Sequence, residues 1–147
     1  MTDIERNKTI VREFIDALYT RGDLSAVDRY LAEDYVDHNP PMGVSPDREG
    51  WRAAGEMIRA ACPDWHSDLH RLVADGDIVV EHFTATGTHR GTLLGVPPSG
   101  RTLTLHGINV FRIADGLVAE RWAQLDDLGM LTALGVVRTA DSTPVPA

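Results

Sequence analysis

The chain has 147 residues, and 14 lysines and arginines against 22 aspartates and glutamates give it a formal net charge of −8. This length suits one domain with a core and room for one internal pocket. The negative charge opposes binding to phosphate backbones, so we expect no nucleic-acid partner. No apolar run approaches the roughly 18 residues of a membrane span, and the first residues are polar and acidic. We therefore expect a cytoplasmic protein that carries no signal peptide and makes no membrane contact.

Two residue counts restrict the chemistry further. Cys62 is the single cysteine, which excludes an internal disulfide and a zinc site made of several thiolates. Lys8 is the single lysine and falls on the polar side of the first predicted helix, which disfavours catalysis through a Schiff base. We therefore expect chemistry that needs no cofactor.

The first third of the chain has the periodicity of helices. Apolar residues recur at helical spacing from residue 3 to about residue 20, and Thr2 with Glu5 forms a capping box. Gly22 ends this helix, and Ser25 is expected to cap a short second one.

A short extended segment, residues 35–38, comes before the next helix. Ser45 and Pro46 are expected to be the cap and the first residue of this helix, which stops before Pro63.

The pattern changes to β-structure after Pro63. Four segments alternate or are rich in β-branched residues: about 65–74, 78–89, 102–113 and 117–126. Asp75-Gly76 and Asp115-Gly116 predict tight hairpin turns, and Asp127 is expected to cap a last helix that Gly135 closes. Helices followed by an antiparallel or mixed, strongly curved sheet give an α+β cone with one apolar pocket. We expect a single domain over residues 1–137 and a disordered tail over 138–147.

Several segments carry a resemblance to a known family: Tyr35 to Pro40, Gly87 to Gly91, Leu94 to Gly100, Gly107 to Ile113, Asp115-Gly116, Glu120 to Trp122 and Leu131 to Gly135. In their order and spacing, over about residues 5–135, the chain resembles the SnoaL-like polyketide cyclases of the nuclear-transport-factor-two-like superfamily. The resemblance implies a cone fold, a hydrophobic small-molecule substrate, a homodimer and cofactor-free ring closure by intramolecular aldol condensation.

The last two strands supply the leading catalytic candidates. Glu120 and Trp122 share one face of the last strand, and His106 and Ile108 share one face of the strand before it. If those faces line the pocket, Glu120 and His106 form an acid/base pair; otherwise Glu120 is a solvated residue or part of an ion pair in the core. The resemblance favours the first reading, because the family has an acidic residue, typically Asp, on its last strand and a histidine on the preceding strand.

Second candidates for catalysis are His38, Asp37 and Asp126. Asp37 and His38 precede the Pro40-Pro41 turn, where Asp37 would otherwise act as a turn cap. Asp126 ends the last strand and would otherwise cap the final helix.

Four apolar side chains are expected to line the substrate pocket: Phe14, Trp51, Ile58 and Trp122. For the tryptophans the alternative is ordinary core packing. The family has a tyrosine on the first helix, and the resemblance places Phe14 at that position, where no hydroxyl is available.

Other functions stay open at this point. His66, Asp68 and His70 alternate on one strand, with His82 on the next, but the opposite face with Trp65, Leu69 and Val73 has the character of a core face. We therefore expect the histidines on the solvated side and no metal site. Alternatives to the cyclase are an epoxide hydrolase or hydration-type enzyme that activates water with Asp126 or Glu120, and a non-catalytic binding protein, which the missing hydroxyl at Phe14 would favour.

Overall fold

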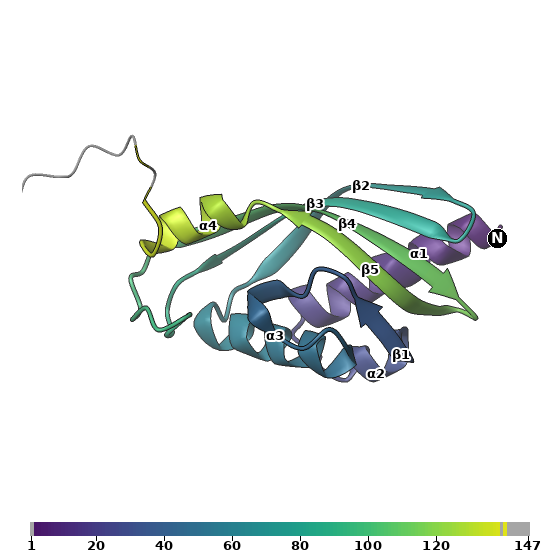
Figure 1. Cartoon of the computed structure of the whole chain (residues 1–147), viewed down its shortest axis with the longest axis horizontal. Helices are drawn as coiled ribbons and strands as arrows, with labels where there is room; N and C mark the ends of the chain where they lie inside the picture. Colours follow the sequence, from purple (N-terminus) through teal and green to yellow (C-terminus); the bar gives the residue numbers. More distant parts are fainter. Residues whose placement is uncertain (1, 139, 141–147) are drawn as a thin grey trace, which may run out of the picture.

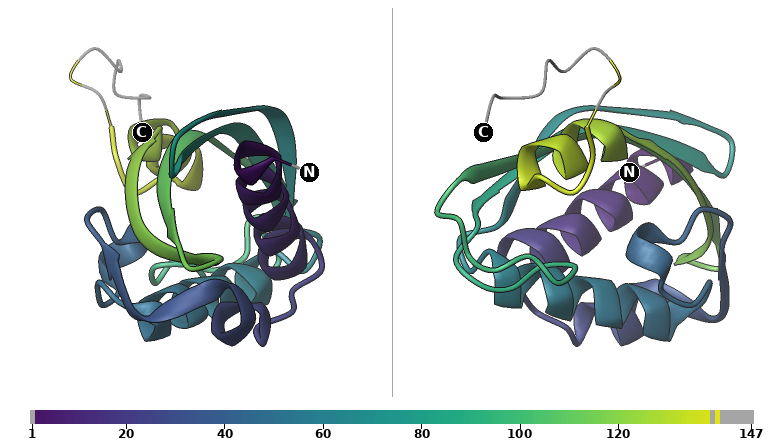
Figure 2. Two further views of the ribbon diagram at one scale, coloured as in Figure 1. Left: turned by 90° about the vertical axis from the view of Figure 1, so that its right-hand side faces the viewer. Right: turned by 60° about the vertical axis from the view of Figure 1, so that its left-hand side comes forward.

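The computed structural model describes residues 2–138 and residue 140, and shows helices packed into the concave side of one curved sheet (Figures 1 and 2). In chain order the elements are α1 Asp3–Ile15, a π-helical turn Asp16–Thr20, α2 Ala26–Tyr30, β1 Leu31–Asp37, a 3₁₀ turn Pro41–Gly43, α3 Arg48–Ala61, β2 His66–Asp75, β3 Ile78–Thr88, β4 Thr102–Ala114, β5 Leu117–Leu125 and α4 Asp127–Leu134. The α+β class and the four long strands are confirmed. Apart from residues 138 and 140, the tail predicted to be disordered lies outside the described residues, and the single domain over 1–137 stays a prediction.

The five strands form one mixed sheet in the order β1-β5-β4-β3-β2. β1 runs parallel to β5, and the other neighbours are antiparallel. Gly107 sits in β4 between Phe83 of β3 and Leu125 of β5. A Cβ atom there would lie 2.6 Å from both of these side chains, so glycine lets them close over the centre of the sheet.

The predicted first helix consists of two pieces. Thr2 caps it as expected, since its hydroxyl accepts a hydrogen bond of 3.1 Å from the backbone of Glu5. The α-helix ends at Ile15, however, and the chain continues as a π-helical turn over Asp16–Thr20. Such turns are rare and often occur at functional sites.

Two of the expected caps are wrong, and a third lacks its hydrogen bond. Ser25 does lie at the N-cap position of α2, but its side chain makes no capping hydrogen bond. The cap of α3 is Asp47, whose carboxylate accepts from the backbone of Gly50, and Ser45 instead donates to Asp47. α4 is capped by Asp126 and includes Asp127, so the cap lies one residue earlier than predicted. Asp and Ser both suit a cap, and the choice depends on where the preceding loop delivers the chain.

Candidate active site

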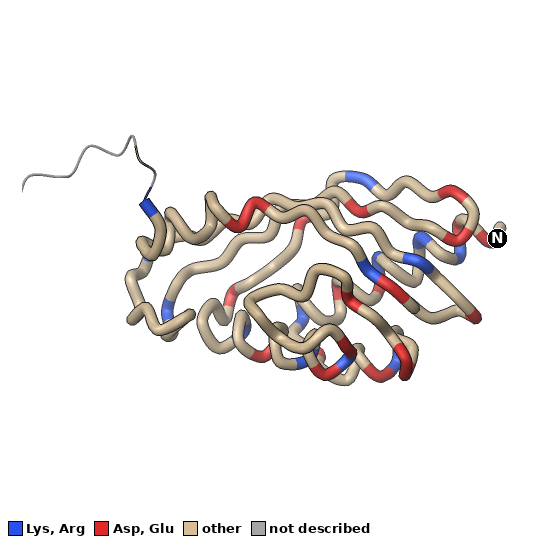
Figure 3. The backbone as a smooth tube through the Cα atoms, in the orientation of Figure 1, with Lys and Arg blue, Asp and Glu red and all other residues tan. Residues whose placement is uncertain are grey.

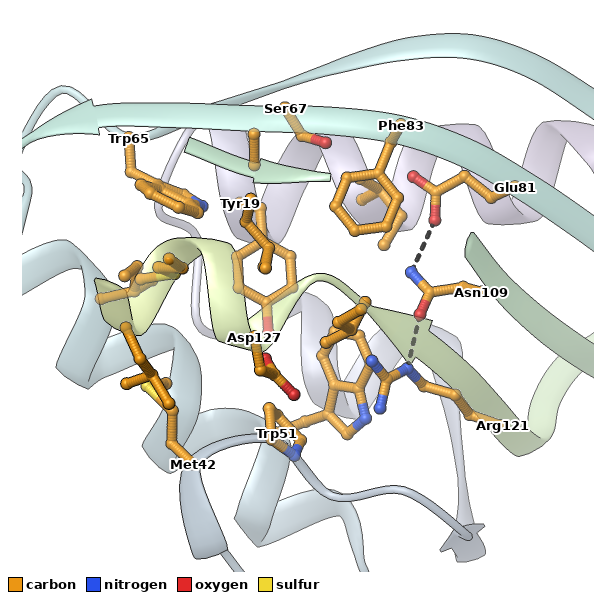
Figure 4. A pocket seen from close by; sticks show the side chains of 18 of the residues that line it. Tyr19, Met42, Trp51, Trp65, Ser67, Glu81, Phe83, Asn109, Arg121 and Asp127 are labelled. Atoms are coloured by element: carbon orange, nitrogen blue, oxygen red, sulfur yellow. Dashed lines mark hydrogen bonds between the residues drawn. The ribbon is translucent and has the colours of Figure 1, made fainter. Parts of the chain in front are cut away.

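A cavity of about 250 Å³ lies between the concave face of the sheet and the helices (Figure 4). Its walls are mostly apolar and aromatic, from Ile15, Tyr19, Pro41, Met42, Trp51, Ile58, Trp65, Phe83, Ala85, Leu94, Leu105, Leu125, Met130 and Leu131. The polar residues of its wall are Ser67, Glu81, Asn109, Arg121 and Asp127. A concave, apolar space with few polar groups is typical of a site for a small hydrophobic molecule.

Three of these polar side chains form a row across neighbouring strands (Figure 4). Asn109 of β4 donates from Nδ2 to Oε2 of Glu81 on β3, at 2.9 Å. Arg121 of β5 donates from Nε to Oδ1 of Asn109, also at 2.9 Å. All three residues are buried. The amide of Asn109 therefore links a carboxyl group to a guanidinium at one end of the cavity.

The charge of Arg121 is balanced by Asp37, which lies behind the cavity wall. Arg121 donates from Nη1 to both carboxylate oxygens of Asp37, at 2.9 and 3.1 Å. Asp37 also accepts from the indole nitrogen of Trp51 at 2.7 Å and from the hydroxyl of Tyr35 at 3.2 Å. Among the described residues, Nη2 of Arg121 has no hydrogen-bond partner, which leaves a donor for a ligand.

The carboxyl group of Glu81 is shielded from water, and its pKa is strongly raised. Its side chain is fully buried, and burial raises its pKa to about 7, although Asn109 and the charge of Arg121 act in the opposite direction. Its Oε1 atom has no hydrogen-bond partner within the described residues. A carboxyl group with a pKa near 7 can both accept and donate a proton at neutral pH.

Tyr19 places a hydroxyl group in the cavity wall, where Phe14 was expected to leave none. The π-helical turn places this ring in the cavity wall, beside Trp51, with ring centroids 5.3 Å apart (Figure 4). Burial raises its pKa, so the hydroxyl stays protonated at neutral pH. Phe14, the expected wall residue, is instead fully buried in the core against Trp51 and Tyr30, and it does not line the cavity.

Asp127 is a second carboxyl group of the cavity wall. It is exposed and begins α4, so it lies where the cavity opens to solvent. The cavity wall shields part of its carboxyl group from water, and this raises the pKa of Asp127.

The expected catalytic pair, Glu120 and His106, lies on the outer face of the sheet and does not line the cavity. Glu120 points outward, where it pairs with Arg112 and lies 3.1 Å from Nε2 of His38. These two partners lower its pKa, Arg112 more than His38. The residues of β5 that line the cavity are Arg121, one position later, and Leu125, because strand side chains alternate between faces.

Three expected site residues besides Glu120, namely His106, His38 and Trp122, lie on the outer face of the sheet. His106 is exposed and lies 3.1 Å from the hydroxyl of Thr84. His38 stacks on Trp122, with ring centroids 4.7 Å apart and an angle of 8° between the planes. Trp122 is therefore not a wall of the cavity, and neither histidine reaches it.

Four further predictions can be compared with the structure. Trp51 and Ile58 line the cavity, as expected. Asp126 caps α4 by accepting from the backbone of Gly129, which is its structural alternative. Asp37 accepts from the backbone of Asn39, as the turn-cap alternative requires, but its main partner is Arg121.

The sequence held one unused signal for the inner face. On β4, Asn109 shares its face with Leu103, Phe111 and Ile113, which is the more apolar set. On β3, Glu81 shares its face with Val79, Phe83 and Ala85. A polar residue within an apolar face is the informative one, and this rule would have found both Asn109 and Glu81.

The histidine row lies on the outer face, as predicted. His66 and His70 of β2 are exposed, and the rings of His70 and His82 are 5.0 Å apart. Val73 was expected in the core but is 56% exposed, because the pairing register shifts between Leu69 and Arg71. Within the described part of the chain, no group of three or more His, Cys, Asp or Glu residues could hold a metal ion.

A second cavity of about 170 Å³ lies between α1 and β2. It shares Glu81, Ser67 and Ile15 with the main cavity, and the prediction of one pocket missed it.

Over the described residues, no helix is long and apolar enough to cross a membrane.

Comparisons with known proteins agree with this fold. A family model described as SnoaL-like polyketide cyclase matches residues 9–134. The chain is 26% identical over 132 residues to the aklanonic acid methyl ester cyclase DauD of Streptomyces sp. (strain C5), across 86% of this chain and 80% of that protein. It is 25% identical over 121 residues to the nogalonic acid methyl ester cyclase of Streptomyces nogalater, across 80% of this chain and 89% of that protein. The solved structure of TsrD from Streptomyces laurentii matches with a TM-score of 0.81 and 34% identity, across 93% of this chain and all of that one. The chain therefore belongs to the SnoaL-like polyketide cyclase family.

Proposed function

We propose that this protein closes a ring in an aromatic polyketide ester by a cofactor-free intramolecular aldol reaction, with Glu81 as the acid/base. The observation that carries this assignment is a buried carboxyl group with a pKa of about 7 at the polar end of an apolar cavity. The family and its methyl ester cyclases support the reaction type.

The proton balance of the reaction needs only one group. The Glu81 carboxylate takes a proton from the acidic carbon between two carbonyl groups, which leaves an enolate. The enolate carbon then forms a bond to the second carbonyl carbon, whose oxygen becomes an alkoxide. Protonated Glu81 returns its proton to that oxygen, so the residue ends in the state in which it began.

Two neighbouring donors can stabilise the oxygen charge that develops. Arg121 has Nη2 available, and Tyr19 presents a neutral hydroxyl in the same wall. Donors that are fixed before the reaction stabilise such charge without reorganisation. Asp37 holds the guanidinium in place through two hydrogen bonds.

The test compares Glu81→Gln with Glu120→Gln on an aromatic polyketide methyl ester. Loss of a general acid/base costs about 10²–10⁴ in rate, so turnover of Glu81→Gln should fall by that factor while Glu120→Gln stays near the parent. Chromatographic detection of the cyclised product gives the rate. Full activity of Glu81→Gln would overturn the proposal, and a loss confined to Glu120→Gln would return the site to the outer face.

The residues that favoured a hydration-type enzyme or a non-catalytic binding protein do not support these alternatives. Asp126 caps α4, and Glu120 with Arg112 lies on the outer face, so neither carboxylate can activate water inside the cavity. The binding-only alternative was based on Phe14, and Tyr19 provides the hydroxyl whose absence favoured it.

The proposal also includes a homodimer and a cytoplasmic location. The family resemblance favours a homodimer formed through the outer face of the sheet, where Ile108 is 44% and Trp122 is 37% exposed. Light scattering should give twice the mass of one chain, and Ile108→Ser with Trp122→Ser should halve it. The net charge of −8 and the interspersed charges along the chain (Figure 3) support a cytoplasmic protein without a nucleic-acid partner.

A further inference from the structure

Three tight turns of the described chain put a residue other than glycine in the left-handed region. These are Met42-Gly43, Leu94-Gly95 and Asp115-Gly116, in which the first residues have φ of 53°, 50° and 53°. The glycines that follow have φ of 73°, 79° and 76°. Two successive positive φ angles are the signature of a type I′ turn.

Backbone hydrogen bonds close two of these turns, and strand pairing closes the third. The backbone of Val44 donates to the carbonyl of Pro41 at 3.1 Å, around Met42-Gly43. Leu93 and Val96 exchange backbone bonds of 3.1 and 2.8 Å around Leu94-Gly95. Asp115-Gly116 joins β4 to β5. The three turns are therefore built alike, on different parts of the fold.

Their residues differ in a way that follows the cavity. Type I′ turns favour Asn, Asp or Gly at the first central position, and Asp115 obeys this preference. Met42 and Leu94 do not, although a short polar residue such as Asn would carry less strain there. These two residues line the cavity, and Asp115 does not.

The side chain of Leu94 is not explained by packing of the core. It is 45% exposed, whereas its neighbour Leu93 is 2% exposed and anchors the loop. Leu94 both lines the cavity and meets solvent, so it lies at the opening. Met42 is half-buried and lines the cavity from the loop between β1 and α3. Strained residues of this kind persist where the surrounding structure requires them, and they cluster at ligand sites.

We propose that Met42 and Leu94 form an apolar clamp at the cavity opening, which contacts the substrate and selects for a flat, apolar molecule. The preferred turn residue is replaced at both positions because the large side chain serves the ligand. This inference rests on the proposed function only in placing the substrate in the cavity.

The test replaces the apolar side chain of each turn by Asn, which the turn prefers but which makes less apolar contact with a ligand. The variants are Met42→Asn and Leu94→Asn, with Asp115→Leu as the matched control in the third turn. The probe is 1-aminoanthracene, a neutral planar tricycle whose fluorescence reports binding, and thermal melting reports stability. Each Asn variant should raise the Kd of the probe by about 3–10-fold and leave Tm equal or higher, because it loses apolar contact but relieves the turn.

The control variant and the conservative variants should keep the Kd of the parent protein. Asp115→Leu should lower Tm and keep Kd within about twofold of the parent, since it strains a turn far from the cavity. Met42→Leu and Leu94→Met should keep the parent Kd. The clamp is overturned if either Asn variant binds the probe within about twofold of the parent, or if it lowers Tm as much as Asp115→Leu does.

The outcome separates this inference from the proposed function. Failure of the parent protein to bind 1-aminoanthracene overturns both the clamp and the use of this cavity. Normal binding with unchanged Kd in the Asn variants overturns the clamp alone. A raised Kd in both Asn variants together with full turnover by Glu81→Gln would overturn the proposed function and leave the clamp in place.

Discussion

Arg121 and Asp37 form a buried ion pair that joins β5 to the end of β1, with Nη1 of Arg121 2.9 Å from Oδ2 of Asp37. The two side chains are 3% and 1% exposed. The pair carries no net charge, so the polar end of the cavity is not cationic, yet it keeps a fixed donor beside Glu81. The same contact attaches the one parallel strand to the rest of the sheet.

Asp37→Asn should strongly destabilise the fold. Removal of one partner leaves the other charge buried without compensation, which costs about 3–5 kcal/mol of unfolding free energy. Urea denaturation measures this loss. Asp34→Asn, at an exposed position of the same strand, should change the unfolding free energy by less than about 0.5 kcal/mol. Equal stability of the two variants would show that the ion pair does not hold β1 in place.

The stability of the protein should depend on the titration of Glu81. Its pKa is about 7 in the folded chain against an ordinary value of 4.5, so the folded state binds the proton more tightly. The Glu81 contribution is therefore intact below about pH 4.5 and is lost as the pH rises to about 7, by up to about 3 kcal/mol. Above that range it should stay level.

Comparison with Glu81→Gln isolates this contribution. The difference in unfolding free energy between parent and variant, measured in urea from pH 4.5 to pH 8, should shift in favour of the variant as the pH rises. A constant difference over this range would mean that Glu81 has an ordinary pKa in the folded protein.

Catalysis should follow the same group. Because the proposed cycle begins with ionised Glu81, kcat/KM should rise with pH through about 7 and then level off. Initial rates over pH 5–9 give the profile, and the inflection should vanish in Glu81→Gln. A profile that falls above pH 7 would instead show that the substrate enters as the enolate and Glu81 acts only as an acid.

The strands were predictable because their periodicity is local. The segments 78–89 and 117–126 agree with β3 and β5 to within one residue at each end. The burial of Arg121 depends instead on a distant part of the chain. The expectation that Glu120 faces the pocket leaves Arg121 on the opposite face, but Asp37, 84 residues earlier in the chain, compensates the charge of Arg121 and permits its burial.

The π-helical turn has no recognisable sequence signal, and the placement of Tyr19 depends on it. The family resemblance pointed to Phe14 as the wall residue of the first helix, but Phe14 precedes the π turn and packs in the core. The additional residue of the π turn shifts only the side chains that follow it, and Tyr19 is the one that reaches the cavity. One irregular turn thus changed the expected substrate wall and removed the main argument for a non-catalytic protein.

Tyr19→Phe should separate the catalytic contribution of this hydroxyl from its structural one. The hydroxyl has no partner among the described residues, so its removal should leave Tm unchanged or slightly higher. If it donates to the developing oxyanion, kcat should fall by about 10–100-fold, the value of one hydrogen bond to a charged oxygen, while the Kd of 1-aminoanthracene stays constant. The matched control is Tyr35→Phe, because Tyr35 donates to Asp37 at 3.2 Å behind the cavity wall. That variant should lower the unfolding free energy by about 1 kcal/mol. An unchanged kcat in Tyr19→Phe would leave Arg121 as the donor to the oxyanion.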